Sequence, residues 1–430
     1  MKNIYIFARA CDLRLLDATK ITQYLKANGY KIVNKPKDAD SIIFITCSFS
    51  SVQGESALSK IELFQKSYDA ELIVGGCLPD IYPEKLSKIF KGRTISTKDL
   101  DEHPEKLDEF FSKNKIKFAD IKDVNIPHMP VYGSNKIASL NKSKPIVSFK
   151  NLLSNSKLLK KIYFRSKRHL VTNLFDLRSM LNKYLRYGKY YEIRISWGCP
   201  GNCSYCVIKR AVGKLKSKPL DECLNEFKKG LQEGYKFFVL NADDTGAYGL
   251  DINSDFPELL DKITRIDGDY EITILDLNPR WIVKYIDKFE EILKRNKIKR
   301  LEIPIQSGSK RILKLMRRFS DVEKVKESLM RLKKADENII LATHQILGFP
   351  SETMDDLEKT LSMICDIAFD EGYVFSFSSS GDSDADKIKP KLSEEEISER
   401  LDWSIKYLKR KGFDSLKASH MNSFVFKKNY

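Results

Sequence analysis

Two absences narrow the possible classes of protein. No run of about 18 apolar residues occurs, which is the length that a membrane-spanning helix needs, so we expect no membrane span. The N-terminus lacks the apolar stretch and small-residue cleavage site of a secretory signal peptide, which predicts a cytoplasmic protein. Because thiols stay reduced in that compartment, we expect the 8 cysteines to be available as ligands.

Histidine is also scarce, with 5 residues in a chain of 430. Cys199, Cys203 and Cys206 have CxxxCxxC spacing and follow the strand-like run Tyr191–Ser196. Thiolates are soft ligands that suit zinc and iron–sulfur clusters. A structural zinc site usually has four ligands, and the nearest histidine, His169, lies well upstream. The spacing therefore favours a four-iron cluster with one open iron, with a zinc knuckle or a chance grouping as the alternatives.

Residues 1–112 alternate between strand and helix patterns, which predicts a parallel sheet. The expected elements are strands Asn3–Ala8, Ser41–Thr46 and Glu71–Gly75 and helices Leu15–Ala27 and Val52–Ser67. One cysteine follows each strand, namely Cys11, Cys47 and Cys77. Each alone could be a core residue, but the carboxyl ends of parallel strands meet at one edge of a sheet. We therefore infer a second three-thiolate site.

Residues 189–390 are interpreted as six βα units, which predicts an open, partial barrel with its active site at the carboxyl ends of the strands. The expected strands are Tyr191–Ser196, Phe237–Asn241, Glu271–Leu275, Arg300–Ile305, Ile339–Ile346 and Tyr373–Phe377, with Leu220–Glu233 and Ile312–Lys333 among the helices. Cys223 and Cys365 fall in helices and are interpreted as packing residues. Residues 391–430 are expected to form one helix, Ser393–Arg410, and a short basic tail.

The formal net charge is +16, and most of it falls in the linker or insertion 113–188. From Lys136 to Lys189 there are 14 Lys or Arg residues and one acidic residue, Asp176, with aromatic residues interleaved. This composition indicates a polyanionic partner, RNA first, or an acidic peptide. A solvated Lys-rich surface and helices packed on the core are the alternatives, because Leu170–Tyr187 has helical spacing.

The CxxxCxxC loop, with Tyr205 before its last cysteine, resembles the signature of radical S-adenosylmethionine (SAM) enzymes. Cys11 with Asp17, Thr46-Cys47-Ser48 and Gly75-Gly76-Cys77 resemble the N-terminal domain of the methylthiotransferase family, where three such cysteines hold an auxiliary 4Fe–4S cluster. The fold so implied is α/β, with a flavodoxin-like parallel sheet followed by a partial (β/α)6 radical SAM barrel. Arg14 and Ala18 depart from the family's Asn and Ser.

Loops of the predicted barrel extend the resemblance. Asn241–Asp251, with its Asp-Thr-Gly-Ala-Tyr-Gly core, and Asn278-Pro279 are similar to the branch acting on N6-threonylcarbamoyladenosine in tRNA. Pro304–Ser309 and Gly348–Thr353 match further family loops. The family usually ends in a small RNA-contacting β-barrel, the TRAM domain, for which we expect no room in residues 391–430.

Two positions on these loops depart from the family. Glu302 stands where the family has His, and His344 stands where it has Asp. Together with the missing TRAM domain, these departures favour a peptide or protein acceptor.

The resemblance implies two 4Fe–4S clusters, on Cys199, Cys203 and Cys206 and on Cys11, Cys47 and Cys77. SAM would yield a 5′-deoxyadenosyl radical at the first cluster, and the second would carry the sulfur. The expected SAM contacts are Tyr205, Asp243, Gln306 and Ser307. A low-potential electron donor and a sulfur donor are implied as partners.

Three functions remain open from the sequence. The first is a methylthiotransferase acting on the threonylcarbamoyladenosine of tRNA. The second keeps this chemistry and takes a peptide or protein acceptor, either a ribosomal protein or a ribosomally made precursor. The third is a non-enzymatic, metal-stabilised RNA-binding protein.

Overall fold

The computed structural model describes residues 2–111, 115–127, 189–380, 382–418 and 423–429. Residues 1–128 and 189–430 pack as one unit. The predicted basic tract and its helix Leu170–Tyr187 lie outside the described residues.

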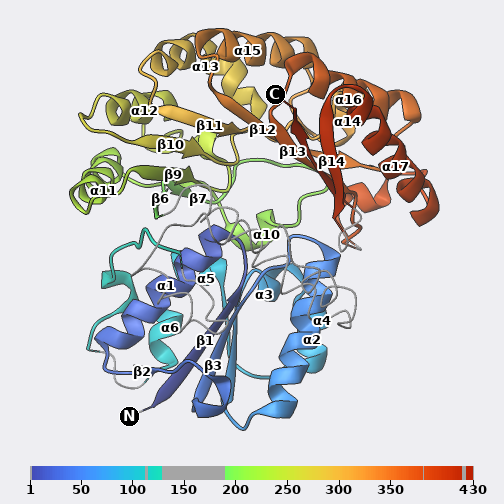
Figure 1. Cartoon of the computed structure of the whole chain (residues 1–430). Helices are drawn as coiled ribbons and strands as arrows, with labels where there is room; N and C mark the ends of the chain where they lie inside the picture. Colours follow the sequence, from blue (N-terminus) through green and yellow to red (C-terminus); the bar gives the residue numbers. More distant parts are fainter. Residues whose placement is uncertain (1, 112–114, 128–188, 381, 419–422, 430) are drawn as a thin grey trace, which may run out of the picture. The chain divides into compact units, whose positions relative to one another are not determined.

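The first sheet has five parallel strands in the order β2-β1-β3-β4-β5 (Figure 1). Their bounds are β1 Asn3–Arg9, β2 Lys31–Ile32, β3 Ser41–Thr46, β4 Glu71–Gly76 and β5 Thr94–Ser96. The order 2-1-3-4-5 is the flavodoxin-like arrangement, so the fold predicted for this part is confirmed. Every residue of β3 is buried, which explains why its sequence is a nearly continuous apolar run.

The helices of this part alternate with the strands. They are α1 Asp12–Ala27, α2 Ser51–Ser67, α3 Leu78–Ile81, α4 Pro83–Ile89, α5 Thr97–Glu102 and α6 Glu105–Glu109, with the 3-10 turns η1 Pro36–Asp38 and η2 Phe118–Asp120. The helix predicted from Leu15 starts earlier, at Asp12, because Cys11 occupies its N-cap position. The Ser50 hydroxyl accepts a hydrogen bond from the Gln53 N–H, which sets the start of α2.

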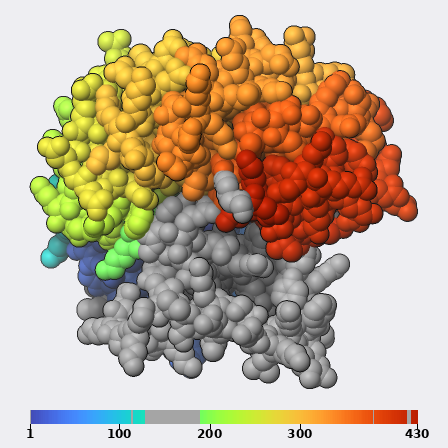
Figure 2. Space-filling view, turned by 45° about the horizontal axis from the view of Figure 1, so that its top comes forward, coloured from blue at the N-terminus to red at the C-terminus, as the bar shows by residue number. Residues whose placement is uncertain are grey.

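The second sheet has eight strands in the order β14-β15-β13-β12-β11-β10-β9-β6. Six are parallel, as predicted: β6 Tyr190–Arg194, β9 Phe237–Asn241, β10 Glu271–Ile274, β11 Ile298–Glu302, β12 Ile340–Leu347 and β13 Glu371–Ser376. The larger helices are α11 Leu220–Gln232, α12 Phe256–Thr264, α13 Pro279–Leu293, α15 Val322–Ala335, α16 Met354–Ile367 and α17 Glu394–Arg410. Figure 2 shows one face of the molecule, on which this part of the chain is coloured green to red.

Strand residues that face these helices form the main core. Leu301, Leu341 and Val374 of neighbouring strands belong to one buried cluster with Leu329 of α15 and Leu361 of α16. Because side chains alternate along a strand, the intervening residues point to the opposite, inner face of the sheet.

The long helix predicted over Ile312–Lys333 is wrong. The structure has two helices, α14 Lys310–Leu315 and α15, separated by a turn in which Arg317 has a φ of +56°. A residue in the left-handed region ends a right-handed helix. The Asp321 carboxylate then caps α15 by accepting a hydrogen bond from the Lys324 N–H at 3.2 Å.

The basic tail predicted at the C-terminus is also wrong. After α17, β14 Phe413–Ala418 and β15 Ser423–Lys428 pair in antiparallel fashion, and β15 adds to β13. Phe424 and Phe426 are buried in the main core, so alternate apolar residues hold this strand in the sheet despite its flanking lysines.

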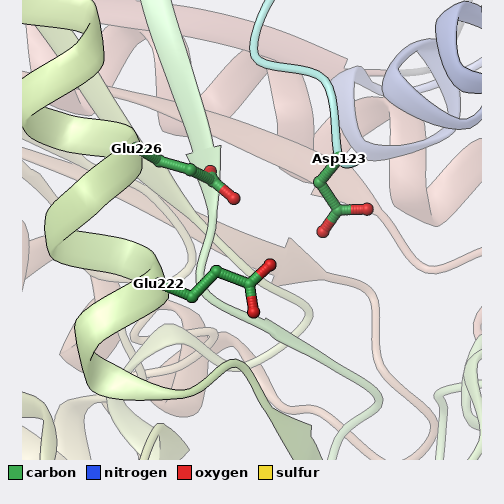
Figure 3. A group of neighbouring side chains, drawn as sticks. All are labelled: Asp123, Glu222 and Glu226. Carbon is green, nitrogen blue, oxygen red and sulfur yellow. The ribbon is translucent and has the colours of Figure 1, made fainter. Parts of the chain in front are cut away.

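An ion-pair cluster connects residues 115–127 to the second sheet. Figure 3 shows Asp123 pointing toward Glu222 and Glu226, which come from α11. The ammonium of Lys218, with 1% of its side chain exposed, lies 3.0 Å from Asp123 Oδ2 and 2.6 Å from Glu226 Oε1. Lys20 also pairs with Asp123, at 3.0 Å. Since internal ammonium groups neutralise these carboxylates, we interpret the cluster as structural.

Lys218→Met is expected to destabilise the protein by about 3 kcal/mol, because it leaves Asp123 and Glu226 without their shared cation. Burial disfavours the charged form of Asp123, but Lys218 and Lys20 hold the pKa of its carboxyl below the usual range. This stabilisation is therefore present at neutral pH and is lost as the pH falls below about 4. Urea denaturation at pH 7 and at about pH 2.5 should show a smaller difference between the two proteins at the lower pH. An equal difference at both pH values would contradict this origin.

Candidate active site

The CxxxCxxC loop lies between β7 Ser196–Trp197 and α10 Lys209–Val212. Its entry is a tight turn at Gly198, which has a φ of +71° and where a Cβ atom would lie 2.0 Å from the Lys214 carbonyl oxygen. Only glycine fits this backbone approach. The Gly198 N–H also donates to Asp243 Oδ2 at 3.1 Å, so a loop of the next βα unit fixes the position of the cysteines that follow.

Backbone N–H groups point at the sulfur atoms of this loop. The Gly201 N–H donates to Cys199 Sγ at 3.3 Å, and the N–H groups of Lys209 and Ile208 lower the pKa of Cys206, although burial raises it overall. Burial, with the nearby Asp244 carboxylate, raises the pKa of Cys199 to about 12. The free thiols of Cys199 and Cys206 therefore keep their protons at neutral pH, and a metal must displace them. Amide donors aimed at sulfur suit thiolate ligands of an iron–sulfur cluster.

The second triplet gathers at the carboxyl edge of the first sheet, as the strand pattern predicts. Cys11 occupies the N-cap position of α1, Cys47 follows β3 and Cys77 precedes α3. The charge of Cys47 acts on both other thiols, and burial raises the pKa of Cys11 and of Cys77 to about 12. Gly76 has a φ of +90°, and a Cβ atom there would lie 2.3 Å from the Thr46 carbonyl oxygen. This close approach of β4 to β3 places Cys77 beside Cys47.

Neither triplet is gathered around a single ion. Among the described residues, three His, Cys, Asp or Glu ligand atoms lie within 4.8 Å of one another only at Asp123, Glu222 and Glu226. Wider spacing of three thiols on one loop or one sheet edge suits a cluster of several irons better than a tetrahedral zinc ion.

Buried charges connect the two triplets. Arg14, with 2% of its side chain exposed, has its Nε 3.2 Å from Asp17 Oδ2, and Asp17 Oδ1 lies 2.7 Å from Arg194 Nη1 of β6. The Arg14 guanidinium lowers the pKa of the Cys11 and Cys77 thiols and that of Asp243, the carboxylate that holds the CxxxCxxC loop, although burial raises all three.

Arg14 itself has spare donor capacity. Its Nη1 is buried and donates no hydrogen bond within the described part of the chain. A buried guanidinium with a spare N–H, beside two of the three thiols, suits an anionic group such as a thiolate-ligated cluster. The sequence showed Arg14 only as a departure from the family pattern.

Several site residues are deeply set and yet accessible. Cys11 is exposed by area, and Tyr205, Asp243 and Arg318 are partly exposed, although protein desolvates all four strongly enough to affect their ionisation.

The four expected SAM contacts differ in how much of each side chain remains available. Tyr205 lies beside Cys203 and Cys206, and burial raises the pKa of its phenol. Asp243 already holds the Gly198 N–H. Gln306 has a φ of +66°, and its backbone bridges to β12 by hydrogen bonds with His344 and Ile346.

Ser307, the fourth expected contact, has its hydroxyl engaged within the protein. The hydroxyl lies 3.2 Å from Thr360 Oγ1 and accepts a hydrogen bond from the Ser309 N–H at 3.1 Å. The SAM-binding roles of these four residues stay predictions.

The sequence missed Arg318, which lies in the turn between α14 and α15. Its Nη2 donates to the Pro304 carbonyl oxygen at 2.6 Å, and its Nη1 lies 4.0 Å from Cys203 Sγ. Arg318 also lines a small cleft together with Asn278, Pro279 and Ser307. The sequence predicted one continuous helix here, which would place Arg318 on its surface. The proximity of Arg318 to Cys203 was therefore not predicted.

Comparisons with known proteins agree with this geometry. Residues 193–364 match the model of the radical SAM superfamily, and residues 3–96 match that of uncharacterized protein family UPF0004. The chain is 30% identical over 407 residues to the ribosomal protein uS12 methylthiotransferase RimO of Syntrophomonas wolfei, covering 93% of this chain and 81% of that protein. The chain belongs to the radical SAM methylthiotransferase family. This methylthiotransferase is therefore an enzyme, and the hypothesis of a non-enzymatic RNA-binding protein is wrong.

Other relatives of this methylthiotransferase are named for different acceptors. It is 25% identical over 417 residues to the probable threonylcarbamoyladenosine tRNA methylthiotransferase of Methanocaldococcus jannaschii, covering 96% of this chain and 85% of that one. Among solved structures, the radical SAM methyltransferase TsrM of Kitasatospora setae has a similar fold, with a TM-score of 0.55 and 12% identity over 87% of this chain and 73% of that one. No helix among the described residues is long and apolar enough to span a membrane.

Proposed function

We propose that Cys199, Cys203 and Cys206 hold the SAM-binding 4Fe–4S cluster of this methylthiotransferase and that Cys11, Cys47 and Cys77 hold its auxiliary cluster. Radical SAM methylthiotransferases use SAM and two such clusters, which supply a carbon-centred radical and a methylated sulfur. The observation that carries this assignment is the buried Arg14, whose charge acts on Cys11 and Cys77 and on the carboxylate that fixes the other cysteine loop.

The chain's own residues position and enclose the reacting groups. Asp243 and Gly198 fix the CxxxCxxC loop, and the Asp17–Arg194 ion pair joins α1, which follows Cys11, to β6 of the second sheet. Holding two sites in one geometry lowers the entropic cost of bringing their reagents together. Burial keeps water away from a reactive intermediate.

For the acceptor, the proposal is the threonylcarbamoyladenosine of tRNA. The loop that carries Asp-Thr-Gly-Ala-Tyr-Gly is firmly held, because Asp244 accepts hydrogen bonds from Arg280 Nη2 at 2.8 Å and Trp281 Nε1 at 2.9 Å. This loop resembles that of the branch acting on the same nucleoside, and the M. jannaschii relative is named for that substrate. The basic tract between Lys136 and Lys189 offers phosphate contacts.

Ribosomal protein uS12 is the second candidate acceptor. The relative from S. wolfei at 30% identity is named for that protein, and several other relatives carry the same name. The alternative of a ribosomally made precursor peptide belongs to the same class of acceptor.

A direct competition assay decides between the two acceptors. The reconstituted enzyme, SAM, dithionite as electron donor and sulfide as sulfur donor are incubated with threonylcarbamoylated tRNA and with uS12, together and separately. The expected result is a methylthio group on the tRNA nucleoside by mass spectrometry and none on uS12. Modification of uS12 alone would overturn the tRNA assignment while leaving the cluster assignment intact.

A further inference from the structure

Ser204 connects the CxxxCxxC loop to the end of α14. Its N–H donates to the Met316 carbonyl oxygen at 3.0 Å, and its hydroxyl donates to the Leu315 carbonyl oxygen at 2.8 Å. Met316 is buried in an apolar cluster against which Tyr205 of the same loop also packs. The turn that follows α14 therefore has a fixed position relative to the cysteines of this loop.

The turn after α14 brings Arg318 to that loop. The Arg318 N–H donates to the Leu313 carbonyl oxygen at 2.8 Å, and the Arg317 N–H donates to the Lys314 carbonyl oxygen at 3.0 Å. Together with the left-handed φ of Arg317, these two bonds form a turn that commonly ends helices. The chain leaves the helix axis here, and the Arg318 side chain lies beside the cysteine loop.

The guanidinium of Arg318 is held at one end and faces a cysteine at the other. Its Nη2 donates to the Pro304 carbonyl oxygen at 2.6 Å, which fixes the position of the group. Its Nη1 lies 4.0 Å from Cys203 Sγ. Burial alone would lower the pKa of Arg318, but neighbours that include Tyr205 and Cys203 raise it overall. The group therefore keeps its positive charge at neutral pH.

A negative charge acts on another cysteine of the same triplet. Burial raises the pKa of Cys199 to about 12, and the Asp244 carboxylate adds to this increase. The carboxylate pairs with Arg280 Nη2 at 2.8 Å, and 4% of its side chain is exposed. Its charge also acts on Arg318. Two cysteines of the triplet thus experience opposite charges, a cation at Cys203 and an anion at Cys199.

Charges near an iron–sulfur cluster affect how readily the cluster accepts an electron. One-electron reduction adds one negative charge to the cluster, and the donor that loses this electron is oxidised. A neighbouring cation stabilises the reduced form more than the oxidised form, whereas a neighbouring carboxylate has the opposite effect. Both effects are larger where protein replaces water, because water screens charges more strongly.

We propose that Arg318 is a positioning residue that acts through Cys203 and makes the cluster of the CxxxCxxC loop easier to reduce, with Asp244 opposing it. This inference rests on the proposed function, which places a 4Fe–4S cluster on these cysteines. It assigns Arg318 to the one-electron reduction that SAM cleavage requires. Because the other cysteine triplet lies on the first sheet, Arg318 should have no effect on the potential of the auxiliary cluster.

A redox titration monitored by electron paramagnetic resonance tests this role without measuring turnover. Dithionite, which is oxidised to sulfite, reduces the reconstituted full-length enzyme in steps. The two clusters are distinguished by the signal that is lost in Cys206→Ala and the signal that is lost in Cys77→Ala. Arg318→Gln should lower the equilibrium constant for reduction of the first cluster on the order of tenfold, because a unit charge at this distance has at least that effect under partial screening. For a one-electron couple, this corresponds to about 59 mV.

Two further variants separate charge from structure. Arg318→Lys keeps the positive charge and should recover at least about half of the shift. Arg317→Gln is the matched control, because it makes the same change in a neighbouring residue that is 47% exposed and pairs with Asp384 at 2.6 Å. It should leave both potentials unchanged, since water screens this pair. An unchanged first cluster in Arg318→Gln would overturn the inference, as would an equal shift in Arg317→Gln or at the auxiliary cluster.

Asp244→Asn tests the opposite sign and does not depend on the stability of Arg318→Gln. It removes a negative charge and should make the first cluster easier to reduce, by a similar factor. If iron analysis shows that Arg318→Gln does not assemble the cluster, Asp244→Asn decides the question. A first cluster that is as hard or harder to reduce in Asp244→Asn would contradict the inference. Retention of the first signal in Cys206→Ala would contradict the cluster assignment itself, and the role of Arg318 with it.

Discussion

Cys206→Ala is expected to abolish the formation of 5′-deoxyadenosine from SAM, whereas Cys77→Ala should preserve it and abolish methylthio transfer. Each variant removes one of three thiolate ligands and should lose about four irons per chain relative to the reconstituted enzyme. Iron analysis, electron paramagnetic resonance of the reduced protein and chromatography of the nucleoside products measure the three effects. Each variant should lose only its own cluster, because the two cysteine triplets lie on different sheets.

Cys365→Ser is the matched control, because Cys365 lies partly buried on α16 and belongs to neither triplet. It should keep both clusters and both products. Loss of 5′-deoxyadenosine in Cys77→Ala at full occupancy of the other cluster would show that the triplets do not act separately. Retention of both clusters in either cysteine variant would contradict the ligand assignment itself.

The sequence predicts the fold well where one pattern decides an element. The short apolar runs Ser41–Thr46 and Phe237–Asn241 each predict a buried strand, and both are strands in the structure. The sequence does not predict an element that depends on a single backbone angle or on a partner strand far along the chain. Nothing in the periodicity of Ile312–Lys333 reveals the positive φ of Arg317, and β15 becomes a strand because β13 offers it an edge.

The same division holds for the site. Cysteines that follow strands can be grouped from the sequence, because sheet topology brings strand ends together. Arg14 and Arg318 could not be found that way, since each matters through neighbours on other elements: Asp17, Arg194 and two thiols for the first, and Pro304 and Cys203 for the second. The contact between Glu302 Oε1 and His344 Nε2, at 3.8 Å, likewise depends on β11 and β12 lying side by side.

Asp17→Asn is expected to destabilise the protein by about 3–5 kcal/mol, because it removes the carboxylate that pairs directly with two buried guanidinium groups. Asp17 has 8% of its side chain exposed, and Arg14 and Arg194 have 2% and 9%. Since amides carry no charge, both guanidinium groups would lose their shared ion-pair partner in a region that water screens poorly. Urea denaturation of the unreconstituted protein measures the loss.

Asp382→Asn makes the same chemical change in an ion pair with Arg210 in which 58% of the Asp382 side chain is exposed, and it should cost no more than about 1 kcal/mol. Asp17 also joins α1, and with it Cys11, to the second sheet. After reconstitution, Asp17→Asn should therefore lose iron from the auxiliary site and keep SAM cleavage. Equal stability of the two variants would contradict the ion-pair argument, and loss of SAM cleavage alone would place the function of Asp17 at the other triplet.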